Sequence, residues 1–222
     1  RPKLETNLSS EVNGRIVEVA DNFIEGGFFN KGDLLVRVEQ ADYLTNVKAA
    51  EASLATAVSA LEEEKARGRV AEEEWRSFTA GKAPELGLRR PQLAGALATV
   101  RSAEAELERA NRDLARTEIR APYSGMVKSR DANLGQFISR GTSVGMIYGT
   151  DIAEIRLPLT DNDLAFLQIP DFTQNSNQPE VVLTAAVAGQ IMQWPARLVR
   201  TEGVLDERSR VIYAVAEVTD PY

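Results

Sequence analysis

The 222-residue sequence contains no cysteine and no histidine. Without thiols there is no disulfide, no thiolate metal site and no cysteine nucleophile. Without imidazoles there is no histidine-based catalytic triad and no histidine metal ligand. The three methionines are scattered along the chain, which argues against a soft-metal site. We therefore predict a non-enzymatic protein with no catalytic residues, no metal site and no cofactor.

Long apolar runs and an excess of basic charge are also lacking. No run approaches the ~20 apolar residues that cross a bilayer. Lys and Arg total 26 against 33 Asp and Glu, a net charge of -7, which argues against a dedicated nucleic-acid binder because phosphate contacts need clustered cations. Hydrophobic residues make up 43% of the chain, enough for a folded core.

Residues 40–117 carry the heptad pattern of a coiled coil. The stretch is dense in Ala, Glu, Leu and Arg, and it has no proline between Ala41 and Ala83. Apolar residues recur every seven positions, each followed three positions later by a second seam residue, as in an a/d seam. In the first arm the two sets are Val47, Leu54, Leu61, Gly68 and Trp75, and Ala50, Ala57, Glu64, Ala71 and Phe78. Gly68 and Glu64 are the imperfect positions.

A second arm repeats this pattern after a break near 79–91. Gly81, Pro84 and Gly87 predict the end of the first helix, and Pro91 suits the first turn of the next. The second seam consists of Leu93, Val100, Leu107 and Leu114, with Ala96, Ala103, Ala110 and Thr117 three positions on. A short connection predicts an antiparallel hairpin, with arms of about 55–60 Å and about 40 Å at ~1.5 Å per residue.

The two flanks of this hairpin, 1–39 and 118–150, resemble each other. In each, a Gly-x-x-apolar-x-x-Gly-x-x-apolar block follows a short strand pattern, once from Gly26 and once from Gly135. Alternating apolar residues around glycine turns predict two halves of one small β-domain. The predicted turn glycines are Gly14, Gly26, Gly32, Gly125, Gly135 and Gly141.

A duplicated strand pattern of this kind is typical of biotinyl and lipoyl carrier domains. In those domains the turn that joins the halves carries the lysine that receives the cofactor. Here the helical hairpin takes the place of that turn, and no Met-Lys-Met or Asp-Lys-Ala sequence is present. The carrier alternative is therefore disfavoured.

Residues 151–222 predict a small β-barrel. Alternating strand patterns lie at 151–159, 181–187, 191–200 and 211–218, and polar turns separate them. A short helix is expected to begin at Thr160, and Asp161 and Asp163 near it are expected to cap it rather than bind a metal. The predicted fold class is α+β and elongated: a lipoyl-like β-domain split by an antiparallel coiled-coil hairpin, then a barrel.

This domain order resembles the periplasmic adaptor (membrane fusion) proteins of tripartite efflux pumps, in the HlyD-like superfamily. Four strings carry the resemblance: SEVNGRIV from Ser10, IRAPYSGMV from Ile119, EIRLPL from Glu154 and WPARLVRTEGVLD from Trp194. The last two look most like the branch that serves resistance-nodulation-division (RND) transporters. Family members also carry a membrane anchor and a membrane-proximal domain, neither of which is found here, so a truncated form is expected.

The resemblance implies a bridge between an inner-membrane RND transporter and an outer-membrane channel, in the periplasm of a Gram-negative bacterium. It implies anchoring to the inner membrane, self-association into a ring in the assembled pump, and no nucleic-acid partner. The tip is expected to contact the channel through Arg76, Phe78, Leu86, Leu88 and Arg89. The RND branch tends to show Arg, Leu four on and Ser seven further; from Arg76 this sequence has Ala80 and Gly87.

One alternative of the same class stays open: an adaptor for an ABC-type or other secretion or efflux transporter. A nucleic-acid-binding arm is an alternative of another class. Segment 76–90 has a local net charge of +3, but only Phe78 is available to stack on a base and the remainder of the hairpin is acidic overall, so this alternative is disfavoured.

Overall fold

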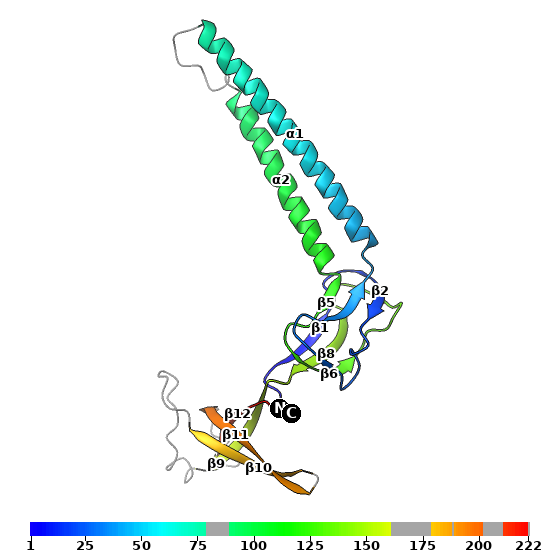
Figure 1. Ribbon diagram of the computed structural model, residues 1–222, viewed down its shortest axis with the longest axis vertical. Coiled ribbons are helices and arrows are strands. Elements are labelled where there is room, and N and C mark those ends of the chain that lie inside the picture. Colours follow the sequence, from blue (N-terminus) through cyan, green and yellow to red (C-terminus); the bar gives the residue numbers. More distant parts are fainter. Residues whose placement is uncertain (79–88, 161–178, 188, 202–210, 222) are drawn as a thin grey trace.

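The computed structural model describes residues 1–78, 89–160, 179–187, 189–201 and 211–221. The molecule is elongated, with a helical hairpin at one end, a two-sheet β-domain in the middle and a third sheet at the other end (Figure 1). The two chain ends lie side by side between the β-domain and the third sheet. The predicted fold class is confirmed: the hairpin is inserted between two halves of the β-domain.

The hairpin consists of α1 (Ala41–Phe78) and α2 (Arg90–Ala115), of 38 and 26 residues. Ala, Glu, Leu and Arg have high helix propensity, and Pro91 occupies the first turn of α2, where its missing N–H costs nothing. At ~1.5 Å per residue the helices are about 57 Å and about 39 Å long. The hairpin therefore extends well beyond the β-domain that carries it.

Polar contacts tie the base of the hairpin to the β-domain. The Tyr43 hydroxyl donates to the Asn13 carbonyl at 2.7 Å, and Gln40 Nε2 donates to the Thr117 hydroxyl, also at 2.7 Å. Arg116 at the end of α2 forms an ion pair with Glu11 at 2.7 Å. These contacts fix the direction in which the hairpin leaves the β-domain.

The β-domain is built from two four-stranded sheets, and each sheet takes two strands from each half of the chain. One sheet has the order β1-β8-β6-β3 and the other β5-β4-β2-β7. Their bounds are β1 Glu5–Ser9, β2 Gly14–Val19, β3 Phe28–Phe29, β4 Leu34–Val38, β5 Glu118–Arg120, β6 Gly125–Arg130, β7 Phe137–Ile138 and β8 Ser143–Gly149. The short strand of each half pairs with the other half, β3 with β6 and β7 with β2, so the halves interlock.

Inward-facing residues of both halves form one core. Phe23, Leu35 and Val144 are fully buried, and Ile16 and Ile147 lie beside them in the same cluster. Burying such side chains contributes roughly 1.5–3 kcal/mol each relative to leaving them exposed. The core residues come from both halves, so neither half could bury its apolar face alone. The two halves therefore form one domain although the hairpin is inserted between them in the sequence.

The six predicted turn glycines fall into two groups. Gly26, Gly32, Gly135 and Gly141 lie in turns with φ between 78° and 90°, a region that residues with a Cβ rarely adopt. Gly14 and Gly125 are instead the first residues of β2 and β6. At Gly125 a Cβ would lie 2.1 Å from the Tyr148 carbonyl oxygen, so this position requires glycine because two strands approach closely.

The third sheet consists of four antiparallel strands in the order β10-β11-β12-β9. They are β9 (Ile152–Thr160), β10 (Glu180–Val187), β11 (Gln190–Thr201) and β12 (Val211–Thr219). They coincide with the four strand patterns of the predicted barrel, and the described residues of this region form this single sheet. The short helix expected from Thr160 lies outside the described residues.

An ion-pair cluster joins the start of the chain to this sheet. Pro2 bridges to Ala153, and the nearly buried Glu154 carboxylate accepts hydrogen bonds from Arg1 and Arg200 at 2.9–3.0 Å. Burial alone would raise the pKa of Glu154, but the hydrogen bonds from Arg200 and Arg1 outweigh it and hold the pKa below its ordinary value. The connection between the β-domain and the third sheet is therefore double: the β8–β9 link and the Arg1–Lys3 segment.

Candidate functional site

The seam between the helices is closed by a small apolar cluster midway along the hairpin. Ala57 and Leu61 of α1 pack there against Val100 and Ala103 of α2, and all four are buried. Alanine at one seam position of each helix lets the backbones approach closely. The hairpin is thus a two-helix arm whose middle is held together by apolar packing.

The predicted seam residues outside this cluster differ in burial. Val47 is buried, Leu54 is half-buried against the cluster, and Leu107, Ala110 and Leu114 are half-buried nearer the base. Leu93 is 36% exposed. Leu93 lines a groove together with Gly68, which occupies a seam position of α1. Because Gly68 has no side chain, that position does not cover Leu93.

At a seam position beyond this cluster, a part-buried ion pair takes the place of apolar packing. Glu64, 8% exposed, accepts two hydrogen bonds from Arg89, at 2.6 Å from Nε and 2.9 Å from Nη2. Arg89 adopts a left-handed backbone conformation, φ 57°, immediately before α2. We predicted Arg89 as a channel contact, and its guanidinium is bound to Glu64 within the hairpin. The channel contact itself stays a prediction. Glu64 at a seam position and a basic pair at the start of the second arm were the available hints in the sequence.

This pairing sets the protonation behaviour of both groups. The hydrogen bonds from Arg89 hold the pKa of Glu64 below its ordinary value, and the pKa of Arg89 is raised for the same reason. A carboxyl whose folded pKa is lowered stabilises the fold above its unfolded pKa, and that stabilisation is lost as the pH falls through the folded pKa.

We therefore expect Glu64→Gln to lower the melting temperature of the hairpin at pH 7. The difference from the wild type should shrink as the pH falls below about 4.3, the ordinary glutamate pKa. Circular dichroism melts at pH 7 and at lower pH measure it. Glu63→Gln is the matched control, because Glu63 pairs with Arg67 at the surface. Equal effects of the two substitutions at pH 7 would contradict a structural role for the buried pair.

The other residues predicted for the tip are only partly described. Arg76 is exposed and pairs with Glu72 along α1. Phe78 is the last residue of α1. Leu86 and Leu88 lie outside the described residues, so a channel contact at the tip stays a prediction.

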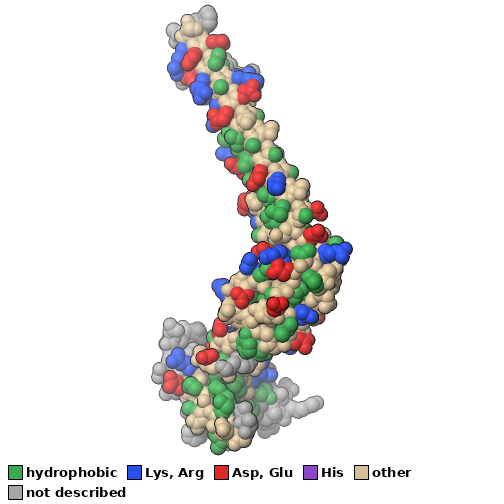
Figure 2. Space-filling model, turned by 45° about the vertical axis from the view of Figure 1, so that its right-hand side comes forward, with side chains coloured by type: hydrophobic (Ala, Val, Ile, Leu, Met, Phe, Trp, Pro, Cys, Tyr) green, Lys and Arg blue, Asp and Glu red, His purple; other side chains and the backbone are tan. Residues whose placement is uncertain are grey.

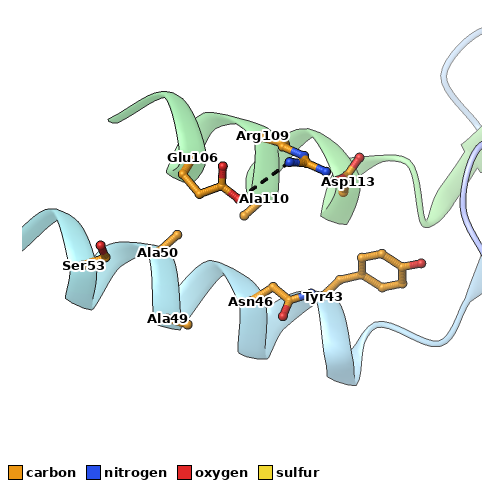
Figure 3. A pocket seen from close by; sticks show the side chains of 9 residues that line it. All are labelled: Tyr43, Asn46, Ala49, Ala50, Ser53, Glu106, Arg109, Ala110 and Asp113. Atoms are coloured by element: carbon orange, nitrogen blue, oxygen red, sulfur yellow. Dashed lines mark ion pairs between the residues drawn. The ribbon is translucent and has the colours of Figure 1, made fainter. Parts of the chain in front are cut away.

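The base of the hairpin carries an open groove of about 470 Å³ (Figure 3). Ala50 of α1 faces Ala110 of α2 across it, and these small side chains leave the space unfilled. The α2 side of the lining is charged: Glu106 and Arg109 form a 3.9 Å ion pair, and Asp113 lies on the same helix. A groove with small residues on one side and charged residues on the other suits the side chains of another helix.

Charge is divided unevenly along α1. Residues 43–61 contain only Lys48 and Glu51 as charged residues, whereas residues 62–76 contain ten. Figure 2 shows Lys, Arg, Asp and Glu side chains crowded on the part of the hairpin farthest from the sheets. The half of α1 nearest the β-domain thus presents a surface of Ala, Ser and Thr that can approach another protein closely without desolvating many charges.

The third sheet carries an uncharged two-stranded ribbon. β12 pairs with β11 only from Ala196 onward, so Gln190–Pro195 pairs only with β10. No Lys, Arg, Asp or Glu lies between Glu180 and Arg197. Val182, Ile191 and Met192 are 67%, 76% and 45% exposed. An isolated two-stranded ribbon is marginally stable, and apolar residues exposed on one indicate an interaction surface.

The described part of the chain contains no group of three or more acidic residues placed to hold a metal ion. None of its helices is long and apolar enough to span a membrane. What the structure offers is therefore a set of surfaces: a hairpin, two grooves along it, a β-domain and an apolar ribbon.

A hairpin inserted into a β-domain of two interlocked sheets defines a class of protein. Residues 5–150 match the family model described as the RND membrane fusion protein (MFP) barrel-sandwich hybrid domain. The match covers more than half of the chain, so this chain belongs to the membrane fusion protein family, the periplasmic adaptors. The resemblance drawn from the sequence is confirmed.

Individual relatives share part of the sequence or the fold. Uncharacterized protein YdhJ of Escherichia coli (strain K12) is 32% identical over 137 residues, which cover 62% of this chain and 47% of YdhJ. A putative efflux transporter from Bacteroides eggerthii DSM 20697 superposes with a TM-score of 0.70 at 18% identity, over 98% of this chain and 59% of that one. The membrane fusion protein Spr0693 from Streptococcus pneumoniae R6 gives 0.67 at 16% identity, over 99% and 87%. The chain thus spans about half the length of the curated relative that it matches.

Proposed function

We propose that this chain is part of the adaptor subunit of a tripartite efflux pump, and that it bridges an inner-membrane RND transporter to an outer-membrane channel. The observation that carries the proposal is the hairpin, an arm of about 57 Å projecting from a barrel-sandwich hybrid domain. An arm of this length spans distance and does no chemistry. We also propose that the adaptor lies in the periplasm of a Gram-negative bacterium and is anchored to the inner membrane.

The channel end of the adaptor is proposed to be segment 76–90. The described helix ends that flank its middle part, Phe78 of α1 and Arg90 of α2, belong to the end of the hairpin farthest from the sheets (Figure 1). The proposed contacts in this segment are Arg76, Phe78, Leu86, Leu88 and Arg89. The Arg89 guanidinium is already paired with Glu64, so we propose that Arg89 also fixes the geometry of the hairpin behind the tip.

A photo-reactive amino acid at Leu86 or Leu88 of the full-length protein should capture the channel in the native envelope. The physical reason is that only the tip reaches the channel. The same probe at Ala52, on the exposed surface of α1 near its base, is the matched control. Capture of the channel from Ala52 but not from the tip would overturn this orientation, and capture from neither would count against the adaptor function.

The transporter end is proposed to be the β10–β11 ribbon. It lies at the opposite end of the molecule from the hairpin tip (Figure 1) and is uncharged and apolar. It has no Lys or Arg to attract anionic lipid headgroups, which favours an apolar surface of a protein partner over a membrane surface.

Ile191→Asp should reduce co-purification of the transporter with the full-length protein several-fold, because the aspartate would have to be desolvated at the contact. Val70→Asp is the control, since Val70 is also exposed, at 54%, but lies on the hairpin. An equal loss from both variants would exclude a specific role for the ribbon. The transporter identified in this experiment also decides between the RND proposal and the ABC-type alternative.

A further inference from the structure

Two segments connect the β-domain to the third sheet, and together they form one two-stranded ribbon (Figure 1). Residues 1–4, which we call the strap, run antiparallel to the end of β8 and the start of β9. On the side of the β-domain, the Leu4 carbonyl accepts a hydrogen bond from the Gly149 N–H at 2.9 Å. On the side of the third sheet, the Lys3 N–H donates to the Ile152 carbonyl at 3.1 Å. The chain therefore passes twice between these two parts of the molecule.

The ribbon contains a bulge between the two parts. Lys3 and Leu4 are adjacent in the strap, but their partners on the other strand are separated by residues 150–151. Extra residues on one strand of an antiparallel pair bend that strand and increase its local twist. The angle between the β-domain and the third sheet is therefore set at this bulge.

One carboxylate connects the strap to the interior of the third sheet. Glu154 of β9, 8% exposed, accepts hydrogen bonds from Arg1 at 3.0 Å and from Arg200 of β11 at 2.9 and 3.0 Å. The Glu154 N–H also donates to the Arg1 carbonyl at 2.8 Å. Lys3 adds an ion pair with Glu217 of β12 at 2.6 Å. The strap is thus fixed to two strands of the sheet and, through Glu154, to a third.

The charges around Glu154 make its carboxylate the decisive group. Arg1 and Arg200 both contact the same carboxylate oxygen, Oε2, at 3.0 and 2.9 Å. Two positive charges are therefore held close together by one negative charge. Without that negative charge the two guanidinium groups would repel each other, and the repulsion would act between the strap and β11. The Lys3 ion pair is more exposed, and pairs of that kind contribute little.

We propose that Glu154 is a latch that fixes the angle between the β-domain and the third sheet. With the carboxylate ionised and both arginines bound, the ribbon is double and the two parts move as one body. Without it the strap leaves β9, and the third sheet swings about residues 149–152. The hairpin leaves from the β-domain, so the latch also sets the distance between the hairpin tip and the third sheet. It depends only on contacts within this chain and is independent of the proposed function.

The absence of cysteine from the chain allows spin labels to be placed one on each part. Val17→Cys in β2 and Glu180→Cys in β10 carry the labels, and both positions are exposed. Pulsed electron paramagnetic resonance on the full-length protein, diluted with unlabelled protein, measures the distribution of distances within one copy. The chain without added cysteines controls for labelling outside these 222 residues. The latched protein should give one narrow distribution.

Two substitutions open the latch from opposite sides. Glu154→Gln should broaden the distribution at least about twofold, because it removes the charge and leaves the two arginines in repulsion. Arg1→Ala should broaden it too, and it leaves the pairing of Arg200 with Glu154 within the sheet in place. Arg1→Lys keeps the charge and should stay narrow. Glu5→Gln is the matched control, because Glu5 pairs with Lys128 inside the β-domain, and it should also stay narrow.

Distributions as narrow as that of the wild type in both Glu154→Gln and Arg1→Ala would overturn the latch. A wild type as broad as Glu154→Gln would overturn it as well, because the parts would then swing with the carboxylate in place. Equal broadening by Glu5→Gln would show that any lost ion pair has this effect and would exclude a specific role for Glu154. If Glu154→Gln unfolds the third sheet, as seen by circular dichroism, Arg1→Ala alone decides, since its side chain is 57% exposed and its loss leaves the sheet intact.

Discussion

Ala103→Glu should unzip the middle of the hairpin and lower its melting temperature more than any surface substitution on α2. Ala103 is 8% exposed and packs with Ala57, Leu61 and Val100 in the one apolar cluster that joins the helices over the described residues. Overpacking a closed site typically costs about 1–3 kcal/mol, and a buried carboxylate without a partner costs more, so a loss of at least about 3 kcal/mol is expected. Circular dichroism at 222 nm during heating measures it.

Ala105→Glu is the matched control for this prediction. It makes the same chemical change two positions along the same helix, where the side chain is exposed. Glu104→Ala, also at an exposed position, removes a charge instead and should be nearly neutral. If Ala105→Glu destabilised the hairpin as much as Ala103→Glu, the seam would lie on a different face of α2.

The seam could be predicted because it depends only on the local heptad repeat. A seven-residue repeat places Ala57, Leu61, Val100 and Ala103 on facing surfaces whatever the remainder of the fold does. The same argument failed to anticipate the exposure of Leu93, because cover depends on the residue opposite and Gly68 supplies no side chain. A heptad pattern predicts well which face of a helix is buried. It predicts less well how completely each residue on that face is covered.

The Glu64–Arg89 pair could not be derived from the pattern, because it depends on tertiary geometry. The residues are 25 positions apart, and they meet where α1 and α2 lie side by side, with Arg89 in a left-handed conformation immediately before α2. The sequence offered an acidic residue in a seam and an arginine beside Pro91, and nothing in their spacing joins them. Arg89 was therefore placed at the channel contact, although its guanidinium points back into the hairpin.

In the β-domain, too, the local pattern could be predicted from the sequence and the tertiary pairing could not. The repeat around Gly26 and Gly135 predicted two similar halves, and both occur as strand, turn, short strand and strand. That β3 would pair with β6 and β7 with β2 was not predictable, because pairing between distant strands depends on how the halves dock.

Two glycine-to-alanine substitutions should shift stability in opposite directions. At Gly125 the added Cβ would lie 2.1 Å from the Tyr148 carbonyl oxygen and 2.9 Å from its carbon, so the backbone of β6 or β8 must move. Because both strands line the core of the β-domain, we expect a loss of several kcal/mol, at the upper end for single substitutions.

At Gly95 in α2 nothing lies within 4 Å of an added Cβ. Alanine restricts the unfolded chain and favours the helix by roughly 0.5–1 kcal/mol, so Gly95→Ala should raise the melting temperature. Thermal melts of both variants, with near-UV spectra to separate the β-domain from the hairpin, test the pair. A Gly125→Ala protein as stable as the wild type would mean that β6 and β8 do not approach as closely as described. A destabilised Gly95→Ala protein would mean that this face of α2 is covered, and that the hairpin does not stand alone in solution.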